Sequence, residues 1–301
     1  MLRKKLKYLL PQLSRFRYYS RFRVFIFDKE RGIRRSFGEK LWLMLRPDSY
    51  VSLPFVDIDI TTFCNLRCKR CAKCIPYYER GQMYSVEEIR EGLELLTKYV
   101  DVIHVGNIIG GEPLLHPQLR EIIEICAANQ KIASLELTTN GTMVPRDEVL
   151  QAMRDGHVTV HISQYDHIAP RLKKTEPLIA KLEEYGITYA YQYHSEWLDF
   201  GEIEEHDYSE EELARILIHC PMNSCAVYNQ KKLYRCGRAS YLDQHGVALN
   251  EGDKIELEKI TDKRETGKKV RRFFGVKAPA ACRYCEAYPQ VIPSGEQMEE
   301  K

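Results

Sequence analysis

Three cysteines with a regular spacing are the part of this sequence that points most clearly to chemistry. Cys64, Cys68 and Cys71 follow the pattern C-x3-C-x2-C, directly after an apolar run of the kind that forms strands. Cysteine thiolates hold iron–sulfur clusters, so three thiolates on one short loop can bind three irons of a 4Fe–4S cluster. The fourth iron would keep an open position, where a small molecule can coordinate and react.

The same stretch also fits a zinc site. Cys74 follows closely after Cys71 and can supply a fourth thiolate, and structural zinc prefers four ligands in a tetrahedron. The spacing alone therefore leaves both an iron–sulfur cluster and zinc open, and with a cluster Cys74 is expected to be structural or incidental.

Polar residues stand where the next three predicted strands end. The first group is Gly110-Gly111-Glu112-Pro113, in which the glycines allow a close backbone approach and Glu112 can accept hydrogen bonds from an ammonium group. Asn140 ends the following strand in a Thr-Asn-Gly turn, and Ser163 ends the next one. Each group alone is also typical of an ordinary turn or loop.

The position of these polar groups in the fold depends on a regular alternation of predicted strands and helices. The apolar patterns predict strands over residues 55–60, 102–105, 132–138, 158–162 and 187–193. They predict helices over residues 85–96, 117–128, 146–154, 172–184 and 209–218, two of them opened by capping boxes. Short links between strand and helix indicate a parallel sheet with right-handed crossovers.

The predicted fold class is α/β, a partial TIM barrel of the (β/α)6 kind with a small C-terminal domain held together by metal, which the resemblance given below makes an iron–sulfur domain. A closed barrel of eight units would need about 250 residues, more than the chain leaves for it. Ligands of such sheets gather at the carboxyl ends of the strands. The expected domains are a basic N-terminal extension (residues 1–50), the partial barrel (51–215) and the C-terminal domain (216–301).

Five of the ten cysteines lie in that C-terminal part: Cys220, Cys225, Cys236, Cys282 and Cys285. A hairpin is predicted around residues 229–232, and the last two cysteines form a C-x2-C pair. Five candidates for four ligand positions leave Cys220 and Cys225 competing, and we favour Cys220. A structural zinc site is the alternative for this set too.

The order of the first motifs resembles the radical S-adenosylmethionine (SAM) superfamily over residues 51–200. Its signature is C-x3-C-x-φ-C after the first strand of a partial TIM barrel. The resemblance implies that Cys64, Cys68 and Cys71 bind a 4Fe–4S cluster whose open iron chelates SAM. It also implies that reductive cleavage of SAM gives a 5′-deoxyadenosyl radical, which abstracts hydrogen from a substrate.

The resemblance extends to the other groups. It implies that Gly110, Gly111, Glu112 and Pro113 bind the amino group of SAM, and that Asn140 and Ser163 lie beside SAM. One position departs from the family pattern: Arg70 stands before the third cysteine, where an aromatic residue near the adenine is usual. A guanidinium group can still stack on a flat ring.

The C-terminal cysteines resemble the twitch domain, a short form of the SPASM domain. This resemblance implies an auxiliary 4Fe–4S cluster held by four of the five cysteines. In outline the chain resembles a dehydrogenase of aminoglycoside biosynthesis that oxidises a hydroxyl of 2-deoxy-scyllo-inosamine. We therefore expect oxidation of a small molecule or sugar, with a flavodoxin or ferredoxin as electron donor. An epimerase or a peptide-maturing enzyme of the same superfamily is the alternative.

Charge is distributed unevenly along the chain. Residues 1–47 carry 14 of the 45 Lys and Arg residues, and aromatic residues alternate with them. Such an arm is usually a solvated face, although contact with a membrane surface is also compatible with it. A zinc protein that binds nucleic acid is a distant alternative, and no stable nucleic-acid partner is expected. No secretory signal and no apolar run long enough for a membrane span are visible, so the expected location is the cytoplasm.

Overall fold

The computed structural model describes residues 38, 50–165, 167–193, 196–223 and 225–298. The predicted basic extension, with its expected solvated face or membrane contact, therefore lies almost entirely outside the described residues. Among the described residues, no helix is long and apolar enough to span a membrane.

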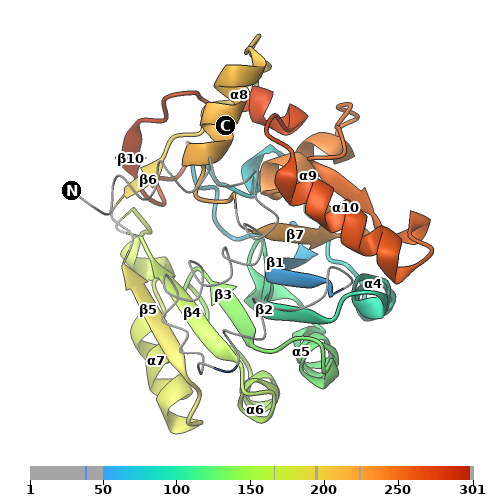
Figure 1. Cartoon of the computed structure of the whole chain (residues 1–301). Helices are drawn as coiled ribbons and strands as arrows, with labels where there is room; N and C mark the ends of the chain where they lie inside the picture. The colour runs from blue at the N-terminus through green and yellow to red at the C-terminus, as the bar shows by residue number, and fades with distance from the viewer. Residues whose placement is uncertain (1–37, 39–49, 166, 194–195, 224, 299–301) are drawn as a thin grey trace.

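One eight-stranded sheet forms the centre of the molecule (Figure 1), in the order β5-β4-β3-β2-β1-β7-β8-β9. Its strands are β1 (Ser52–Thr61), β2 (Val102–Gly110), β3 (Leu135–Thr139), β4 (Thr159–Gln164), β5 (Tyr189–Tyr193), β7 (Ala226–Asn229), β8 (Lys232–Tyr234) and β9 (Lys254–Glu256). Strands β1 to β5 and β7 pair in parallel, whereas β8 and β9 join antiparallel. The predicted α/β class with a parallel central sheet is confirmed. Over the described residues the strand order has two ends, so the sheet is an open, partial barrel.

Helices connect the parallel strands along the outside of the sheet. The α-helices are α4 (Val86–Lys98), α5 (Leu119–Ala128), α6 (Asp147–Asp155), α7 (Thr175–Glu184), α8 (Glu210–His219), α9 (Gly237–Gln244) and α10 (Lys263–Gly275). Figure 1 shows α4 to α7 side by side along the outer face of β1 to β5. Short 3₁₀ helices are η2 (Ile75–Tyr77), η3 (Pro113–Leu115), η4 (Pro170–Leu172), η5 (Leu257–Lys259) and η6 (Ala280–Tyr284).

The expected helix starts are present in the structure. The Ser85 hydroxyl accepts a hydrogen bond from the N–H of Glu88, and the Glu88 carboxylate accepts one from the N–H of Ser85, which makes a complete capping box. Ser209 and Glu212 form the same pair at the start of α8. Each box satisfies backbone donors that a helix terminus leaves without an intrahelical partner.

The apolar core lies between the sheet and the outer helices. Val56, Ile58 and Ile60 on β1 are fully buried in this cluster. Because side chains alternate along a strand, Asp57 and Asp59 face the opposite side of the sheet, where they are also buried. Burying each of the three apolar side chains contributes about 1.5–3 kcal/mol. The polar side chains of β1 are therefore directed towards the inner face, where a ligand would bind.

The sixth parallel strand comes from an unexpected part of the chain. β7 joins the sheet beside β1 rather than after β5. The predicted hairpin is present as β7 and β8, with Gln230 and Lys231 at positive φ, as a two-residue hairpin turn requires. The predicted partial barrel and C-terminal part thus share one sheet. A separate antiparallel ribbon pairs β6 (Glu196–Leu198) with β10 (Val291–Pro293).

Candidate functional site

The cysteine loop and the Gly-Gly-Glu-Pro motif are in direct backbone contact. The N–H of Gly111 donates to the carbonyl of Thr61 (2.8 Å), and the N–H of Glu112 donates to the carbonyl of Phe63 (2.9 Å). A Cβ atom at Gly110 would lie 2.1 Å from the Thr61 oxygen, and one at Gly111 would lie 2.1 Å from the Phe63 oxygen. The glycines therefore permit close approach of the cysteine loop itself.

Glu112 is completely buried and connects the end of β2 to the end of β3. One carboxylate oxygen, Oε1, accepts from the N–H of Leu114 (3.0 Å) and the hydroxyl of Thr139 (2.8 Å), while Oε2 accepts from the N–H of Asn140 (2.8 Å). Burial raises the pKa of Glu112 to about 7, against these hydrogen bonds, which lower it. Because a carboxylate oxygen can accept two hydrogen bonds, Oε2 has capacity for one more donor. Pro113, also buried, opens η3 directly after it.

Asn140 fastens the end of β3 to the cysteine loop. Its Nδ2 donates to Oδ1 of Asn65 (3.0 Å) and faces Sγ of Cys64 (3.8 Å). Its Oδ1 accepts from both the N–H and the hydroxyl of Thr142 (3.0 and 2.6 Å), and Asn65 in turn donates to that hydroxyl (2.8 Å). The carboxyl ends of β1, β2 and β3 are thus joined into one polar site beside Cys64.

The three predicted cluster ligands share one apolar environment. Cys64, Cys68 and Cys71 pack with Leu66 and Ile168 in the same small cluster. Burial raises the pKa of Cys64 and of Cys68 to about 12, and it also raises the pKa of Cys71. A neighbouring thiolate would raise the pKa of Cys64 and of Cys68 further, so these thiols need a metal to stabilise their charged form.

A 4Fe–4S cluster fits this donor set. N–H groups already point at two of the sulfurs, from Leu66 to Cys64 (3.4 Å) and from Gln297 to Cys68 (3.2 Å), and such donors are typical around cluster thiolates. Among the described residues, no three His, Cys, Asp or Glu side chains converge on a point where they could hold one metal ion. A cluster does not require such convergence, because each cysteine binds a different iron.

Arg70 and Ser163 lie beside this site. The guanidinium group of Arg70 forms ion pairs with Asp199 (2.7 Å) and Glu202. The sequence alone also allows this group to stack on a flat ring. Ser163 is buried at the end of β4. Burial raises the pKa of Tyr165, and a hydrogen bond with Ser163 lowers it. Tyr165 packs on the cysteine cluster, which places Ser163 near the cysteine loop.

A buried ion-pair network on the inner face was missed by sequence reasoning. Nζ of Lys73 lies 2.8 Å from both Asp57 and Asp59. Asn107 on β2 donates to Asp57 (2.8 Å) and accepts from the hydroxyl of Thr138 on β3 (2.9 Å). The alternation of acidic and apolar residues in β1 could have predicted that Asp57 and Asp59 share the inner face. Lys73 follows the cysteine loop, so this network connects the loop to the inner face of the sheet at β1.

The structure brings four of the five C-terminal cysteines together. Cys220, at the end of α8, Cys236, at the start of α9, and Cys282 and Cys285 in and after η6 line one pocket. Cys225 instead packs against Phe55 and Val105 in a different cluster. Burial raises the pKa of Cys220 and Cys285 to about 12. Of the two competing cysteines, Cys220 lines this pocket and Cys225 does not.

Cys74 is close to both cysteine sets. Its side chain is fully buried, and burial raises the pKa of its thiol. Cys71 of the first set and Cys236 and Cys285 of the second also raise that pKa. A Cβ atom at Gly237 would lie only 2.8 Å from the carbonyl of Ala72, so α9 begins in contact with the first cysteine loop. The two sets are therefore neighbours.

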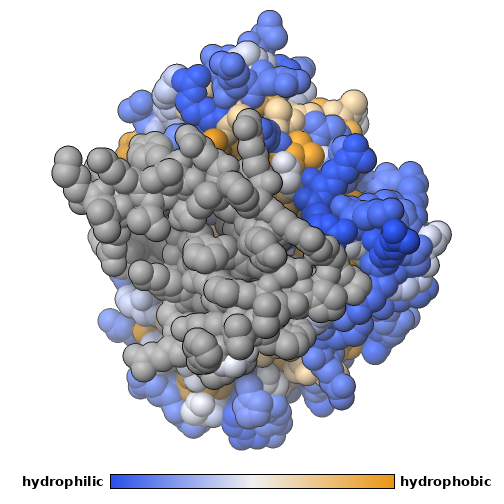
Figure 2. Space-filling view, in the orientation of Figure 1, coloured by the Kyte–Doolittle hydropathy of each residue, from blue (hydrophilic) through white to orange (hydrophobic). Residues whose placement is uncertain are grey.

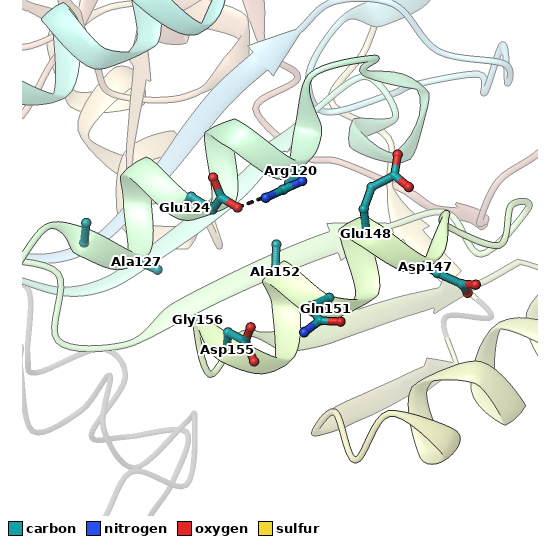
Figure 3. A pocket seen from close by; sticks show the side chains of 10 residues that line it. Arg120, Glu124, Ala127, Asp147, Glu148, Gln151, Ala152, Asp155 and Gly156 are labelled. Carbon is teal, nitrogen blue, oxygen red and sulfur yellow. Dashed lines mark hydrogen bonds and ion pairs between the residues drawn. The ribbon is translucent and has the colours of Figure 1, made fainter.

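A separate surface groove lies between α5 and α6 (Figure 3). It is lined by the acidic residues Glu124, Asp147, Glu148 and Asp155, and Arg120 pairs with Glu124 at 2.8 Å. Both helices belong to the outer layer of the sheet (Figure 1). In Figure 2 the described surface on the side of α4 and α10 is predominantly hydrophilic.

Known proteins resemble part of this chain in sequence. A family model described as "Radical SAM superfamily" matches residues 58–191, which run from β1 to β5. The GTP 3′,8-cyclase of Chlorobaculum tepidum is 35% identical over 107 residues, which are 35% of this chain and 32% of the cyclase. That of Listeria monocytogenes is 29% identical over 145 residues, 44% of this chain and 42% of the cyclase. The chain thus spans less than half the length of these curated relatives.

Solved structures also align with the chain. BtrN in complex with AdoMet and 2-DOIA aligns with 80% of this chain and 98% of its own, at 14% identity and a TM-score of 0.45. Streptococcus suis SuiB bound to S-adenosylmethionine aligns with 48% of this chain and 34% of its own, at 16% identity and a TM-score of 0.38. Together with the cysteine loop and the parallel sheet, the family match shows that residues 58–191 form a radical SAM superfamily domain.

Proposed function

We propose that this chain is a radical SAM enzyme whose 4Fe–4S cluster is held by Cys64, Cys68 and Cys71. The observation that carries the proposal is the meeting of the cysteine loop with Glu112 and Asn140 at the carboxyl ends of β1, β2 and β3. When bound, the cluster and SAM supply one-electron chemistry, in which reductive cleavage of SAM provides a radical that abstracts hydrogen from the substrate.

The chain's own residues would bind and orient SAM. Glu112 would accept a hydrogen bond from its ammonium group through Oε2, and the positive charge would favour the ionised carboxylate. Gly110, Gly111 and Pro113 would hold Glu112 against the cysteine loop. Asn140 and Ser163 would contact SAM from β3 and β4. The ion pairs of Lys73 with Asp57 and Asp59 would line the substrate site on the inner face of the sheet.

We further propose an auxiliary 4Fe–4S cluster held by Cys220, Cys236, Cys282 and Cys285. Their common pocket and their proximity to Cys74 support it. A second cluster beside the first would accept an electron from a substrate radical, which suits oxidation of a small molecule or sugar. Such a reaction needs a low-potential electron donor of the flavodoxin or ferredoxin type. Epimerisation and peptide maturation are the competing outcomes within the same superfamily.

A nucleotide substrate is the second candidate. It is favoured by the relatives named GTP 3′,8-cyclase, which match up to 44% of this chain. Incubation with SAM, a reductant and either GTP or an amino sugar separates the two. Deuterium transfer into 5′-deoxyadenosine from one labelled substrate class and not the other would decide between them.

The site assignment is tested by loading the protein. Anaerobic reconstitution with iron and sulfide should give an electron paramagnetic resonance (EPR) signal in the reduced protein that changes when SAM is added. A Cys64→Ala/Cys68→Ala/Cys71→Ala variant should lack the SAM-sensitive signal. Cys126→Ala is the matched control, because Cys126 is buried on α5 in the apolar core and should leave the signal intact. A SAM-sensitive signal in the triple variant would refute the assignment.

A further inference from the structure

A short segment far along the chain, residues 295–298, pairs with the cysteine loop. The N–H of Lys69 donates to the carbonyl of Glu296 (2.6 Å), and the N–H of Met298 donates to the carbonyl of Arg67 (2.7 Å). Cys68 and Gln297 stand opposite each other in this antiparallel bridge. The middle cysteine of the loop is thus in register with one particular glutamine.

The side chain of Gln297 completes the contact with the loop. Its Oε1 accepts from the N–H of Arg67 (2.8 Å), and its Nε2 donates to the carbonyl of Gly295 (2.7 Å) and to Sγ of Cys68 (3.2 Å). Turning the amide around would place its NH2 group against the Arg67 N–H and its oxygen against the Gly295 carbonyl. These neighbours therefore fix which atom faces the sulfur.

The rest of the segment is held independently of that amide. β10 pairs with β6 just before it, and Ser294 is buried. Gly295 has φ +68°, and a Cβ atom there would lie 2.3 Å from Cβ of Tyr165. The ion pair between Lys69 and Glu296 (2.6 Å) is about two-fifths exposed, so it contributes little. Backbone contacts therefore keep Gln297 in place even if its side chain is changed.

We propose that Gln297 raises the reduction potential of the cluster held by Cys64, Cys68 and Cys71, and this rests on the proposed function. Hydrogen bonds to cluster sulfurs are one of the factors that set the potential of iron–sulfur centres. An N–H donor at Cys68 stabilises the reduced cluster more than the oxidised one, because the reduced cluster carries one more negative charge. Gln297 is thus a positioning residue that makes the cluster easier to reduce.

The test is a redox titration of the reconstituted protein, followed by the EPR signal that changes on SAM addition. Gln297→Met removes the donor, and Gln297→Glu also places a negative charge against the sulfur. The midpoint potential should become more negative in both, with the larger shift for Gln297→Glu, while iron content stays at the wild-type level. Glu296→Gln is the matched control: it breaks the exposed ion pair in the same segment and should not lower the potential.

Two results would overturn the inference alone. One is a SAM-sensitive signal whose midpoint potential is the same in wild type, Gln297→Met and Gln297→Glu. The other is loss of iron from both Gln297 variants, which would make the residue a support for the loop. If the wild type itself takes up iron but shows no SAM-sensitive signal, or takes up no iron, the proposed function fails and the inference fails with it.

Discussion

At the scale of single residues, the site is defined by polar groups whose burial needs compensation. Glu112 is inaccessible to solvent, yet it accepts three hydrogen bonds and has a pKa raised to about 7 by burial. Nζ of Lys73 lies 2.8 Å from two buried carboxylates, those of Asp57 and Asp59. Such groups destabilise a fold when they lose their partners, so each depends on the hydrogen bonds and ion pairs around it.

The raised pKa of Glu112 predicts a pH-dependent stability of the cluster-free protein. The folded carboxyl group keeps its proton up to about pH 7, whereas an ordinary one releases it near 4.5. The favourable contribution of the neutral carboxyl is therefore full at low pH and is lost as pH rises through about 7. Relative to Glu112→Gln, the wild type should lose up to about 3 kcal/mol of stability between pH 5 and pH 8. Urea denaturation of both proteins at the two pH values measures it, and a constant difference would contradict it.

The Lys73 network predicts a large effect of a single substitution. Lys73→Met leaves Asp57 and Asp59 buried without their cation, which should cost about 3–5 kcal/mol. Adding Asp57→Asn and Asp59→Asn should recover part of that loss, because the unpaired charges are then absent. Urea denaturation of cluster-free protein compares the three proteins. A loss below about 1 kcal/mol for Lys73→Met would mean that water or another cation compensates the carboxylates.

At the scale of elements, the loops after the strands are positioned by backbone contact. The two glycines of the Gly-Gly-Glu-Pro motif are pressed against the cysteine loop, and residues 295–298 bridge it from the other side. The glycine contact leaves no room for a Cβ atom, because the atoms that meet there are backbone atoms. The position of the cysteines therefore depends on segments about 45 and 230 residues away in sequence.

This packing predicts that Gly111 cannot be replaced. A Cβ atom there would lie 2.1 Å from the Phe63 carbonyl, so Gly111→Ala should destabilise the protein by at least about 3 kcal/mol or displace the cysteine loop. Gly275→Ala is the matched control, because nothing lies within 4 Å of a Cβ atom at that position. Thermal unfolding and iron content of the two variants test this. Equal values for Gly111→Ala and wild type would show that the loop can shift freely.

Local sequence patterns predicted most elements and the three cysteines of the loop. The capping boxes, the apolar periodicity of α4 and α8 and the strands β1 to β5 all follow from neighbouring residues. The position of β7 beside β1 and the three-residue strands β6 and β10 depend on partners far away in the chain. For the same reason, the residues next to Gln297 in sequence do not predict its contact with Cys68. Those next to Lys73 do not predict its ion pair with Asp57.

At the scale of the whole molecule, two cysteine sets are brought together by one sheet. β7 pairs with β1, and α9 then begins against the loop that follows β1. Cys74 is buried at this junction. With the auxiliary cluster proposed above in place, this arrangement would suit electron transfer between the two clusters.

The proposed ligand set of the auxiliary cluster predicts the iron content of two matched variants. With two 4Fe–4S clusters the wild type should bind about eight irons. Cys220→Ala should lose up to about four, because Cys220 lines the pocket of the second set. Cys225→Ala should keep the full amount, because Cys225 packs against Phe55 and Val105. Iron and sulfide analysis after anaerobic reconstitution measures the iron content of each protein. Loss of iron from Cys225→Ala and not from Cys220→Ala would mean that Cys225 is the ligand instead of Cys220.

The central claim is that the site formed by the cysteine loop and Glu112 cleaves SAM. The most direct measurement is the amount of 5′-deoxyadenosine formed from SAM and dithionite by reconstituted wild type, with the Cys64→Ala/Cys68→Ala/Cys71→Ala variant and Cys126→Ala alongside. The account predicts nucleoside from wild type and Cys126→Ala, and none from the triple variant. Equal amounts from the triple variant and wild type, or no nucleoside from an iron-loaded wild type with any substrate class tested, would contradict it.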